Sequence, residues 1–213
     1  MARLELILIR HGETDWNKES IFRGHEDVRL YATGIAQADA AAETLKDKVF
    51  EAVYSSPLKR AMVTAKRIAA PHEIEVRDKF GFVDINYGLW QGKRESSVKE
   101  MHPKLYERWL SSPAKVKFPG GESVKKSWKR VNTALREVLF LHGTGSVVIV
   151  THRIPLKFMT TYLLGKRLVE FNDVVHDPCA ISIFDVEGRK YKPVVLNDSS
   201  HLAKLRLAKP KDF

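Results

Sequence analysis

Residues 4–14 read LELILIRHGET, and this stretch decides the fold. Its first six residues, Leu4–Ile9, are mostly branched aliphatics with little alternation, which is typical of a short strand buried on both faces of a parallel sheet. Arg10, His11 and Gly12 follow directly. In open α/β sheets, ligands bind at the carboxyl ends of the strands, where a glycine also lets a ligand approach the backbone. The stretch therefore predicts an anion-binding site immediately after the first strand.

Outward from this stretch, strand patterns alternate with helical patterns along most of the chain. We expect strands at 4–9, 52–54 and 147–150, followed by an antiparallel hairpin of 180–185 and 191–196. Helices are expected at 35–47, 58–70, 95–101, 103–112, 123–142 and 153–165. Such alternation predicts an α/β domain, a three-layer sandwich with a mostly parallel central sheet flanked by helices.

The segment 80–123 differs from the rest, because glycines and prolines interrupt it throughout. We interpret it as an irregular, partly helical insertion that lies over the sheet, within a single domain of residues 1–213. The chain shows no internal repeat and no interdomain linker.

The composition excludes several classes of protein. Hydrophobic residues make up 44% and charged residues 29% of the 213 residues, which argues against a disordered chain. No apolar run approaches the length of a membrane span, and the N-terminus does not resemble a signal peptide. The single cysteine, Cys179, excludes an internal disulfide framework and a cysteine zinc site. We therefore expect a cytoplasmic protein without a membrane partner.

The net charge of +10 favours anionic partners such as phosphate esters or nucleic acids. Half of this excess lies at 113–130, where Lys and Arg side chains are opposed only by Glu122. A solvated surface explains such a run, and a nucleic-acid-binding surface is the alternative. Aromatic residues on which bases can stack are limited there to Phe118 and Trp128, so we expect no nucleic acid partner.

Further motifs recur in order along the chain. They are Arg10-His11-Gly12-Glu13-Thr14, Phe22–Asp27 with Leu30, Ser55–Ala61 with Thr64-Ala65, Gly88–Gly92, Gly121-Glu122-Ser123 and Val150-Thr151-His152. This set runs from residue 4 to about residue 165 and resembles the histidine phosphatase superfamily of phosphoglycerate-mutase-like proteins, its small phosphatase branch in particular. Gln91 stands where that family has Glu.

The resemblance implies that His11 is a nucleophile that attacks phosphorus and becomes a phosphohistidine. That role requires a neutral imidazole whose other ring nitrogen donates to an acceptor, usually a backbone carbonyl. Arg10 and Arg60 match the arginines that bind phosphoryl oxygens, a task that suits guanidinium because it pairs bidentately and stays charged. His152 matches the second histidine of the family and would complete the cradle at the start of a helix. The chain carries no ligand cluster for a metal.

The resemblance implies substrate contacts for Asn17, Arg23, Gly24 and His201, and Arg153 is a further candidate. Asn17 would donate to the phosphoryl group, and Arg23 and Gly24 would offer backbone N–H groups. Arg153 departs from the family, which usually has glycine there, and its side chain either adds a cation to the pocket or points into solvent. His201 lies in a C-terminal stretch that resembles a motif of the family's phosphatases.

The general acid is a second departure. Most relatives of this branch carry Glu four residues before the Gly-x-Trp motif, where this chain has Asp84. The acid-phosphatase branch uses an Asp directly after the second histidine, where this chain has Arg153, so that option is closed. The acid must hold a proton while a phosphate anion is bound, which burial favours. We expect Asp84 to be the acid, with Glu122 and Glu13 as the alternatives.

These residues favour a metal-independent phosphomonoesterase that hydrolyses small phosphorylated metabolites through a phosphohistidine. The alternative is a cofactor-dependent phosphoglycerate mutase. Mutases of this family carry a longer insertion with an Asn-Lys and an Arg-Arg pair, neither of which has a convincing place in 88–123. A non-enzymatic module that binds phosphate or nucleic acid is less favoured, because it leaves a complete catalytic set unexplained. We expect no cofactor, and a homodimer stays open.

Overall fold

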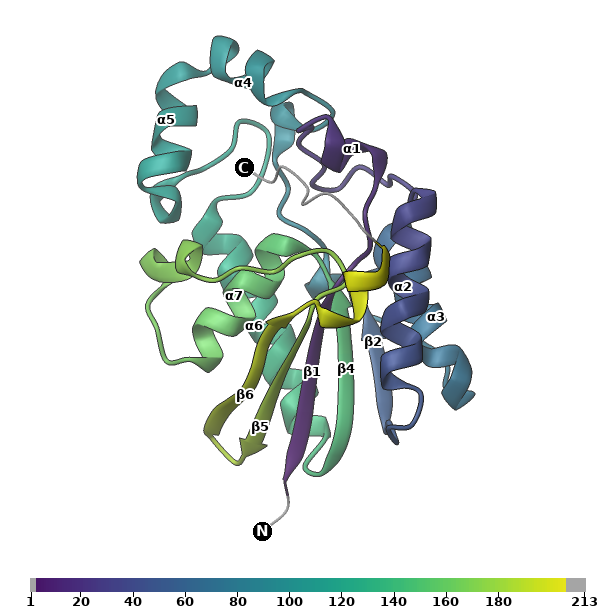
Figure 1. Cartoon of the computed structure of the whole chain (residues 1–213). Coiled ribbons are helices and arrows are strands. Elements are labelled where there is room, and N and C mark those ends of the chain that lie inside the picture. Colours follow the sequence, from purple (N-terminus) through teal and green to yellow (C-terminus); the bar gives the residue numbers. More distant parts are fainter. Residues whose placement is uncertain (1–2, 206–213) are drawn as a thin grey trace.

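The computed structural model describes residues 3–205, which form one mixed six-stranded sheet between helical layers (Figure 1). The strands are β1 (Leu4–Arg10), β2 (Ala52–Ser55), β3 (Val76–Asp78), β4 (Gly145–Thr151), β5 (Ile181–Glu187) and β6 (Lys190–Asp198). Their order in the sheet is β3-β2-β4-β1-β5-β6. The first four strands run parallel, whereas β5 is antiparallel to both β1 and β6. The predicted α/β sandwich with a mostly parallel sheet is therefore confirmed.

Helices cover both faces of this sheet. The α-helices are α1 (Asp15–Lys18), α2 (Ala32–Leu45), α3 (Lys59–Ala69), α4 (Glu95–Met101), α5 (Pro103–Ser111), α6 (Val124–Leu141) and α7 (Arg153–Leu163). Short 3-10 turns lie at Ala70–His72, Phe80–Phe82, Gly88–Trp90, Pro113–Lys115, Leu168–Asp173 and Ser200–Leu205. Helices α2 and α3 pack on one face, and α6 and α7 pack on the other (Figure 1). Within residues 3–205, no helix has the length and apolar character needed to cross a membrane.

Strand β1 is buried on both sides because its side chains alternate between two hydrophobic clusters. Leu4, Leu6 and Leu8 pack in the cluster that contains α6 and α7, and Ile7 and Ile9 pack in the cluster that contains α2 and α3. All five side chains are at most 1% exposed. A strand that loses water on both faces needs apolar residues at consecutive positions, which is the pattern seen in the sequence.

The register of the parallel strands brings distant residues together at one edge of the sheet. Arg10 is paired with Thr151 and Ser55 with Val150, so β1, β2 and β4 end side by side. The backbone N–H of His11 donates to the Thr151 carbonyl oxygen at 2.9 Å, which extends the pairing one residue past β1. The loops that follow these three strands therefore meet at the carboxyl edge of the sheet.

The segment 80–123 lies above this edge, where α4 and α5 stand over the strands (Figure 1). Four of its aromatic side chains, Tyr87, Trp90, Trp109 and Phe118, are at most 4% exposed. They belong to the same hydrophobic cluster as the α6 and α7 face of the sheet. Apolar packing thus fixes the segment next to the strand ends.

Two short elements are absent from the sequence-based prediction. Strand β3 has three residues at the edge of the sheet, and only Val76 among them is half-buried. Helix α1 is a single turn of four residues. Elements this short contain little more than one period of a strand or helix pattern, so no repeat marks them in the sequence.

Helix α2 begins at Ala32, three residues before the predicted start, so Gly34 lies inside the helix. A Cβ at Gly34 would lie 2.1 Å from the carbonyl oxygen of Glu13, and a Cβ at Gly12 would lie 2.2 Å from the carbonyl oxygen of Gly34. Any side chain at either glycine would overlap with backbone. The two glycines therefore let the loop after β1 pack directly against α2.

Candidate active site

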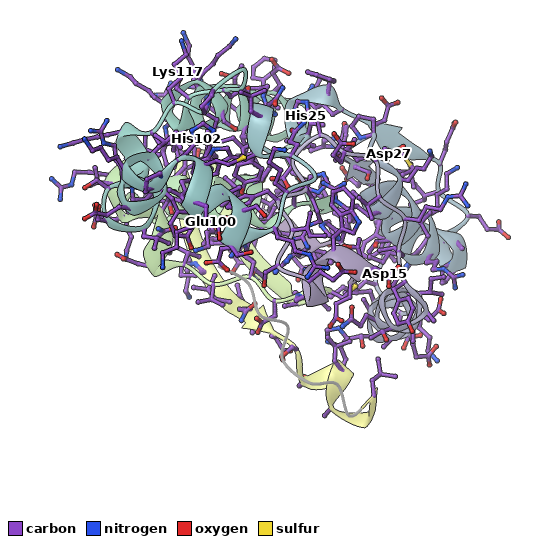
Figure 2. The ribbon with its side chains drawn as sticks, turned by 90° about the horizontal axis from the view of Figure 1, so that it is seen from above. Asp15, His25, Asp27, Glu100, His102 and Lys117 are labelled. Atoms are coloured by element: carbon purple, nitrogen blue, oxygen red, sulfur yellow. The ribbon has the colours of Figure 1, made fainter. Side chains whose placement is uncertain are left out.

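Residues from several loops line a narrow pocket at the carboxyl edge of the sheet. They are His11, Ile21, Phe22, Arg23, Asp84, Tyr87, Arg153 and Ile154. Figure 2 looks down on this edge, with His25 and Asp27 toward one side and Glu100 and His102, at the end of α4, toward the other. The pocket combines an imidazole, a carboxylate, a phenol and two guanidinium groups.

The imidazole of His11 is 2% exposed, and its Nδ1 lies 2.6 Å from the carbonyl oxygen of Gly12. Since a carbonyl oxygen can only accept, Nδ1 carries the proton, which leaves the lone pair on Nε2. Burial, followed by the positive charges of Arg60, Arg10 and Arg23, lowers the pKa of His11 well below its ordinary value. The ring is therefore neutral at physiological pH, as a nitrogen nucleophile must be.

Arg60 is buried in the first turn of α3, and backbone carbonyls hold its guanidinium group. Its Nη1 donates to the Glu26 carbonyl oxygen at 2.7 Å, and its Nη2 donates to the Gly24 carbonyl oxygen at 2.8 Å. Burial lowers the pKa of Arg60 to about 10, against the opposing effect of the Asp84 carboxylate. The guanidinium group is therefore still charged at neutral pH.

Arg10 is the last residue of β1 and is 1% exposed. Its Nη1 donates to the carbonyl oxygen of His176 at 2.8 Å, and its own carbonyl oxygen accepts from the Cys179 N–H at 3.0 Å. The loop before β5 thus holds both the side chain and the backbone of Arg10. A fixed guanidinium group beside His11 suits the binding of an anion.

His152 is the N-cap of α7 and is fully buried, with hydrogen bonds at both ring nitrogens. Arg60 Nε donates to its Nδ1 at 3.2 Å, so Nε2 carries the proton and donates to Ser56 Oγ at 2.8 Å. The ring centroids of His152 and His11 are 5.1 Å apart, in an edge-on arrangement. Burial and the charge of Arg60 lower the pKa of His152 well below its ordinary value. His152 therefore orients Arg60 beside His11, and its own contact with a phosphoryl group stays a prediction.

Asp84 lines the pocket, and both its carboxylate and its backbone carbonyl have partners. Its Oδ1 accepts from the Ile85 N–H at 2.9 Å, and its Oδ2 lies 3.6 Å from Nη2 of Arg60. The Asp84 carbonyl oxygen accepts from His25 Nε2 at 2.9 Å and from Arg130 Nη2 at 3.1 Å. A carboxylate held next to the nucleophile in this way is placed to exchange a proton with a bound ester.

The two alternative acids lie outside the pocket lining. Glu122 is held by the Arg130 guanidinium at 2.8 Å and by the Asn86 N–H at 3.1 Å. Burial alone would raise the pKa of Glu122, but these partners hold it below its ordinary value, so the side chain is ionised. Glu13 accepts from Gln37 Nε2 at 2.8 Å, on the side of the loop that packs against α2. Neither is placed to protonate a leaving group in the pocket.

Two of the predicted substrate contacts line the pocket, and Gly24 is the chain neighbour of one of them. Arg23 and Arg153 line it, so Arg153 adds a cation to the pocket. Gly24 lies beside Arg23 in a turn with φ of +53°, where a Cβ would lie 2.3 Å from Oε1 of Gln91. Only glycine fits this turn without strain, and its carbonyl group orients the Arg60 side chain.

The other two predicted contacts have different neighbours. Asn17 Oδ1 accepts from the Thr14 N–H at 2.9 Å and so closes the single turn of α1. His201 Nε2 donates to the Cys179 carbonyl oxygen at 3.1 Å. Neither Asn17 nor His201 is among the residues that line the pocket, and substrate binding by them stays a prediction.

The sequence of this chain matches the model of a known family. Residues 6–199 match the family model of the histidine phosphatase superfamily, branch 1. The chain belongs to this superfamily. The predicted resemblance is thereby confirmed.

Relatives of this histidine phosphatase include enzymes with assigned substrates. Phosphoserine phosphatase 1 of Hydrogenobacter thermophilus is 36% identical over 93% of this chain and 94% of its own length. The metal-independent phosphoserine phosphatase of Arabidopsis thaliana is 36% identical over 81% of this chain and 76% of its own length. A mutant phosphoserine phosphatase of Entamoeba histolytica, solved in complex with phosphoserine, has a TM-score of 0.83 at 29% identity, covering 93% of this chain and 99% of that one.

Two residues of the histidine phosphatase site, Tyr87 and Ser56, were not predicted from the sequence. Tyr87 lines the pocket, and burial together with the Asp84 charge raises its pKa, so the phenol is protonated. Ser56 accepts the Nε2–H of His152. Both were within reach of the sequence, since Ser56 lies in the motif Ser55–Ala61 just after a predicted strand and Tyr87 directly precedes a motif glycine.

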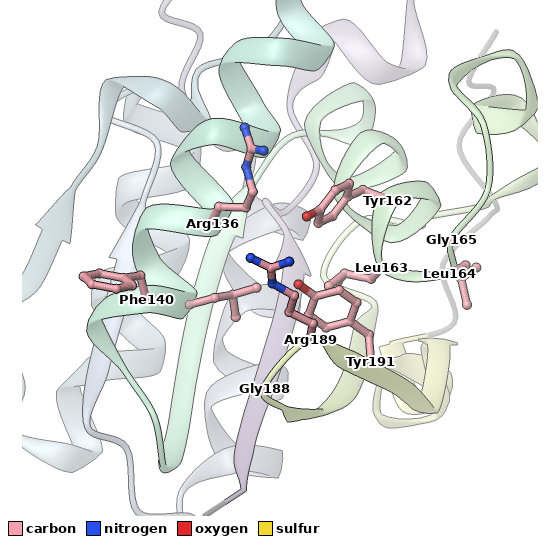
Figure 3. Close-up of a pocket in the computed structure, with 10 residues that line it drawn as sticks. Arg136, Phe140, Tyr162, Leu163, Leu164, Gly165, Gly188, Arg189 and Tyr191 are labelled. Carbon is pink, nitrogen blue, oxygen red and sulfur yellow. The ribbon is translucent and has the colours of Figure 1, made fainter.

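A larger pocket of about 860 Å³ lies elsewhere in this histidine phosphatase, between α6, α7 and the β5–β6 hairpin. Figure 3 shows the phenol oxygen of Tyr191 beside the guanidinium group of Arg189, with the phenol oxygen of Tyr162 on the same side of the pocket. Its lining, among residues 3–205, contains neither a histidine nor a carboxylate. It therefore lacks both the nucleophile and the proton donor that the smaller pocket combines.

Acid should destabilise this histidine phosphatase through its buried imidazoles. The pKa values of His11 and His152 are well below the ordinary value, and burial lowers the pKa of His176 to about 3. In the unfolded chain these groups take up protons near pH 6.5, whereas in the fold they stay neutral to lower pH. The unfolded state therefore binds more protons below about pH 6.5. The free energy of unfolding should fall there by up to about 1.4 kcal/mol per pH unit for each histidine.

Urea unfolding measured between about pH 7.5 and pH 5.5 tests this dependence. The free energy of unfolding should be constant above the ordinary histidine pKa and should decrease below it. His176→Gln should make the decrease shallower, because it removes one of the three buried imidazoles. A free energy of unfolding that does not change over this range would contradict the prediction.

Proposed function

We propose that this chain is a metal-independent phosphomonoesterase that hydrolyses small phosphorylated metabolites through a phosphohistidine at His11. The observation that carries the proposal is the pocket shared by His11 and Asp84. The Gly12 carbonyl oxygen engages Nδ1 and leaves Nε2 of His11 for a ligand. A nitrogen nucleophile and a carboxyl group around one phosphoester are what phosphoryl transfer to an imidazole requires.

The proposed reaction has two steps. In the first, the Nε2 lone pair of His11 attacks phosphorus, the P–O bond to the alcohol breaks, and the bonding electrons go to the alcohol oxygen. The protonated carboxyl of Asp84 gives that oxygen its proton, so a neutral alcohol leaves. In the second, the Asp84 carboxylate takes a proton from water as the water oxygen attacks phosphorus. The P–N bond breaks, its electrons return to Nε2, and inorganic phosphate leaves.

Arginines supply the positive charge in this proposal. Phosphoryl transfer depends on positioning and on charge stabilisation, and Arg10 and Arg60 are both fixed beside His11. Arg60 also lies 3.6 Å from Asp84, and a phosphate dianion bound to Arg60 opposes a second negative charge there. Substrate binding therefore favours the protonated carboxyl that the first step needs. Nowhere in 3–205 do three His, Cys, Asp or Glu side chains form a group that could hold a metal ion.

We propose phosphoserine as the first substrate to test, because two relatives bear it in their names and a third was solved with it bound. A phosphoglycerate mutase would use the same His11 but return the phosphoryl group to a bound sugar acid. The residues 88–123 contain no Asn-Lys pair and no Arg-Arg pair, which supports the phosphatase.

The free, buried thiol of Cys179 fits the reducing cytoplasm that we propose as the compartment.

A panel of phosphate esters tests the proposal. The purified protein is incubated with O-phosphoserine, 3-phosphoglycerate and p-nitrophenyl phosphate, with and without EDTA and with and without 2,3-bisphosphoglycerate. We expect release of inorganic phosphate that EDTA leaves unchanged. Interconversion of phosphoglycerates that requires the bisphosphate and releases no phosphate would establish the mutase instead. Activity that EDTA removes and Mg²⁺ restores would contradict metal independence.

A further inference from the structure

We propose that Arg153 binds a second anionic group of the substrate, a carboxylate a few bonds from the phosphate ester. The enzyme would thereby select phosphorylated amino and hydroxy acids over esters of alcohols that lack a carboxylate. This inference rests on the proposed function, because it concerns the alcohol that departs from phosphorus.

The position of Arg153 places it at the alcohol half of the pocket. It follows His152, whose ring lies against that of His11, and its side chain lines the pocket. Its guanidinium group is hydrogen-bonded to the hydroxyl of Tyr87, and the Asp84 carboxylate also acts on that hydroxyl. Since Asp84 must reach the alcohol oxygen in the proposed reaction, the guanidinium and the phenol lie next to the departing alcohol.

Tyr87 holds this arrangement rigidly. Its ring is 4% exposed and packs edge-on against Phe22, Phe118 and Trp109, with centroid distances of 5.1, 4.9 and 6.1 Å. Because a guanidinium group can only donate, the phenol oxygen accepts from Arg153 and keeps its own proton for another acceptor. Guanidinium and phenol together thus present fixed donors to an anion, with little side-chain entropy left to lose on binding.

The positive charge of the pocket also favours the binding of a second anion. The charged residues of the lining are Arg23, Arg153 and Asp84. Once Asp84 is protonated for the first step, the lining keeps two positive charges and no negative one. An alcohol with a carboxylate balances part of this charge, whereas one without it leaves the cations partly desolvated and unbalanced. The narrow pocket keeps that carboxylate close to the ester.

A different role for Arg153, binding of the phosphoryl oxygens themselves, makes a different prediction. In that role its loss would slow all phosphate esters alike. Binding of a second anion instead makes the loss depend on the carboxylate. Two pairs of esters differ chiefly in that group, O-phosphoserine against O-phosphoethanolamine and 3-phosphoglycerate against glycerol 3-phosphate.

The experiment compares kcat/KM within each pair for the wild type, Arg153→Gln and Arg153→Lys. The wild type should prefer the carboxylate-bearing ester by about 10- to 100-fold, the range for a hydrogen-bonded ion pair. Arg153→Gln should bring this ratio close to one, and Arg153→Lys should retain part of it, since it keeps the charge but loses the planar fork. Lys157→Gln, which removes a cation from the same helix outside the pocket lining, is the matched control and should keep the wild-type ratio.

Two results would overturn the inference. One is a wild type without preference for the carboxylate, and the other is an Arg153→Gln variant that slows both members of a pair equally. Calorimetric binding of the same pairs to His11→Ala, with and without Arg153→Gln, repeats the comparison without turnover. If the wild type hydrolyses none of the esters, the proposed function fails, and the binding ratio still decides whether Arg153 recognises the carboxylate.

Discussion

His11→Ala should lower kcat/KM for every phosphate ester by about 10⁴-fold or more. The variant removes the atom that bonds to phosphorus, and no other ring nitrogen replaces it. The nearest imidazole, His152, has its Nδ1 engaged by Arg60 and its Nε2 proton engaged by Ser56. Hydrolysis of p-nitrophenyl phosphate and of O-phosphoserine measures the loss.

Rapid quenching in alkali should trap a phosphoryl group on His11 of the wild type during turnover. The bond should break in acid, as expected for a P–N linkage, and peptide mapping should place it at residue 11. His72→Gln is the matched control, because His72 packs against Phe50 outside the pocket lining. It should keep both turnover and the trapped group. A His11→Ala variant that keeps more than a small fraction of the wild-type activity would refute the phosphohistidine intermediate.

Asp84→Asn should slow alkyl phosphates such as O-phosphoserine by about 10²- to 10⁴-fold, the usual contribution of a general acid. An alkoxide leaves poorly without a proton, whereas p-nitrophenolate leaves well without one. The first step should therefore remain fast with p-nitrophenyl phosphate. The amide keeps the volume of the side chain and its acceptor for the Ile85 N–H, so the pocket should stay intact.

The second step also loses its base in Asp84→Asn, which gives a separate signature. With p-nitrophenyl phosphate the variant should release a burst of p-nitrophenol equal to the enzyme concentration, followed by slow turnover and an accumulated phosphoenzyme. Glu122→Gln, which removes a carboxylate that is paired with Arg130 outside the pocket lining, should show the wild-type dependence on the leaving group. Equal losses of kcat/KM, which reports the first step, for both kinds of ester in Asp84→Asn would place the acid elsewhere.

The sequence predicts the fold best where burial leaves a pattern. Strand β1 touches two cores, so consecutive apolar residues mark it, and β4 is marked in the same way by Val147–Val150. The edge strand β3 touches little of the core and leaves no pattern. The sequence also predicts too late a start for α2, because a glycine usually interrupts a helix. In this fold Gly34 lies inside the helix and allows close contact with the loop after β1.

The site shows a similar division. Residue types at the strand ends indicate phosphoryl chemistry, because His11, Arg60 and His152 stand in motifs that a family shares. The sequence does not show which ring nitrogen of His11 faces a ligand. The 2.6 Å contact of Nδ1 with the Gly12 carbonyl oxygen decides this in the fold. The sequence also does not determine the direction of the Arg153 side chain. It depends on Tyr87, which only the folded segment 80–123 brings to the start of α7.

In the proposed reaction, separate stretches of this polypeptide provide the groups that act on phosphorus and the groups that act on the departing alcohol. The groups proposed to capture phosphorus lie at or after the ends of β1, β2 and β4, whereas Asp84 and Tyr87 come from the segment 80–123. During evolution, substitutions in that segment can change which alcohol is accepted while the capturing machinery is inherited unaltered. Exchanging the segment 80–123 between relatives should transfer the preference for a metabolite with it. One ancestral reaction can in this way be applied to many different metabolites.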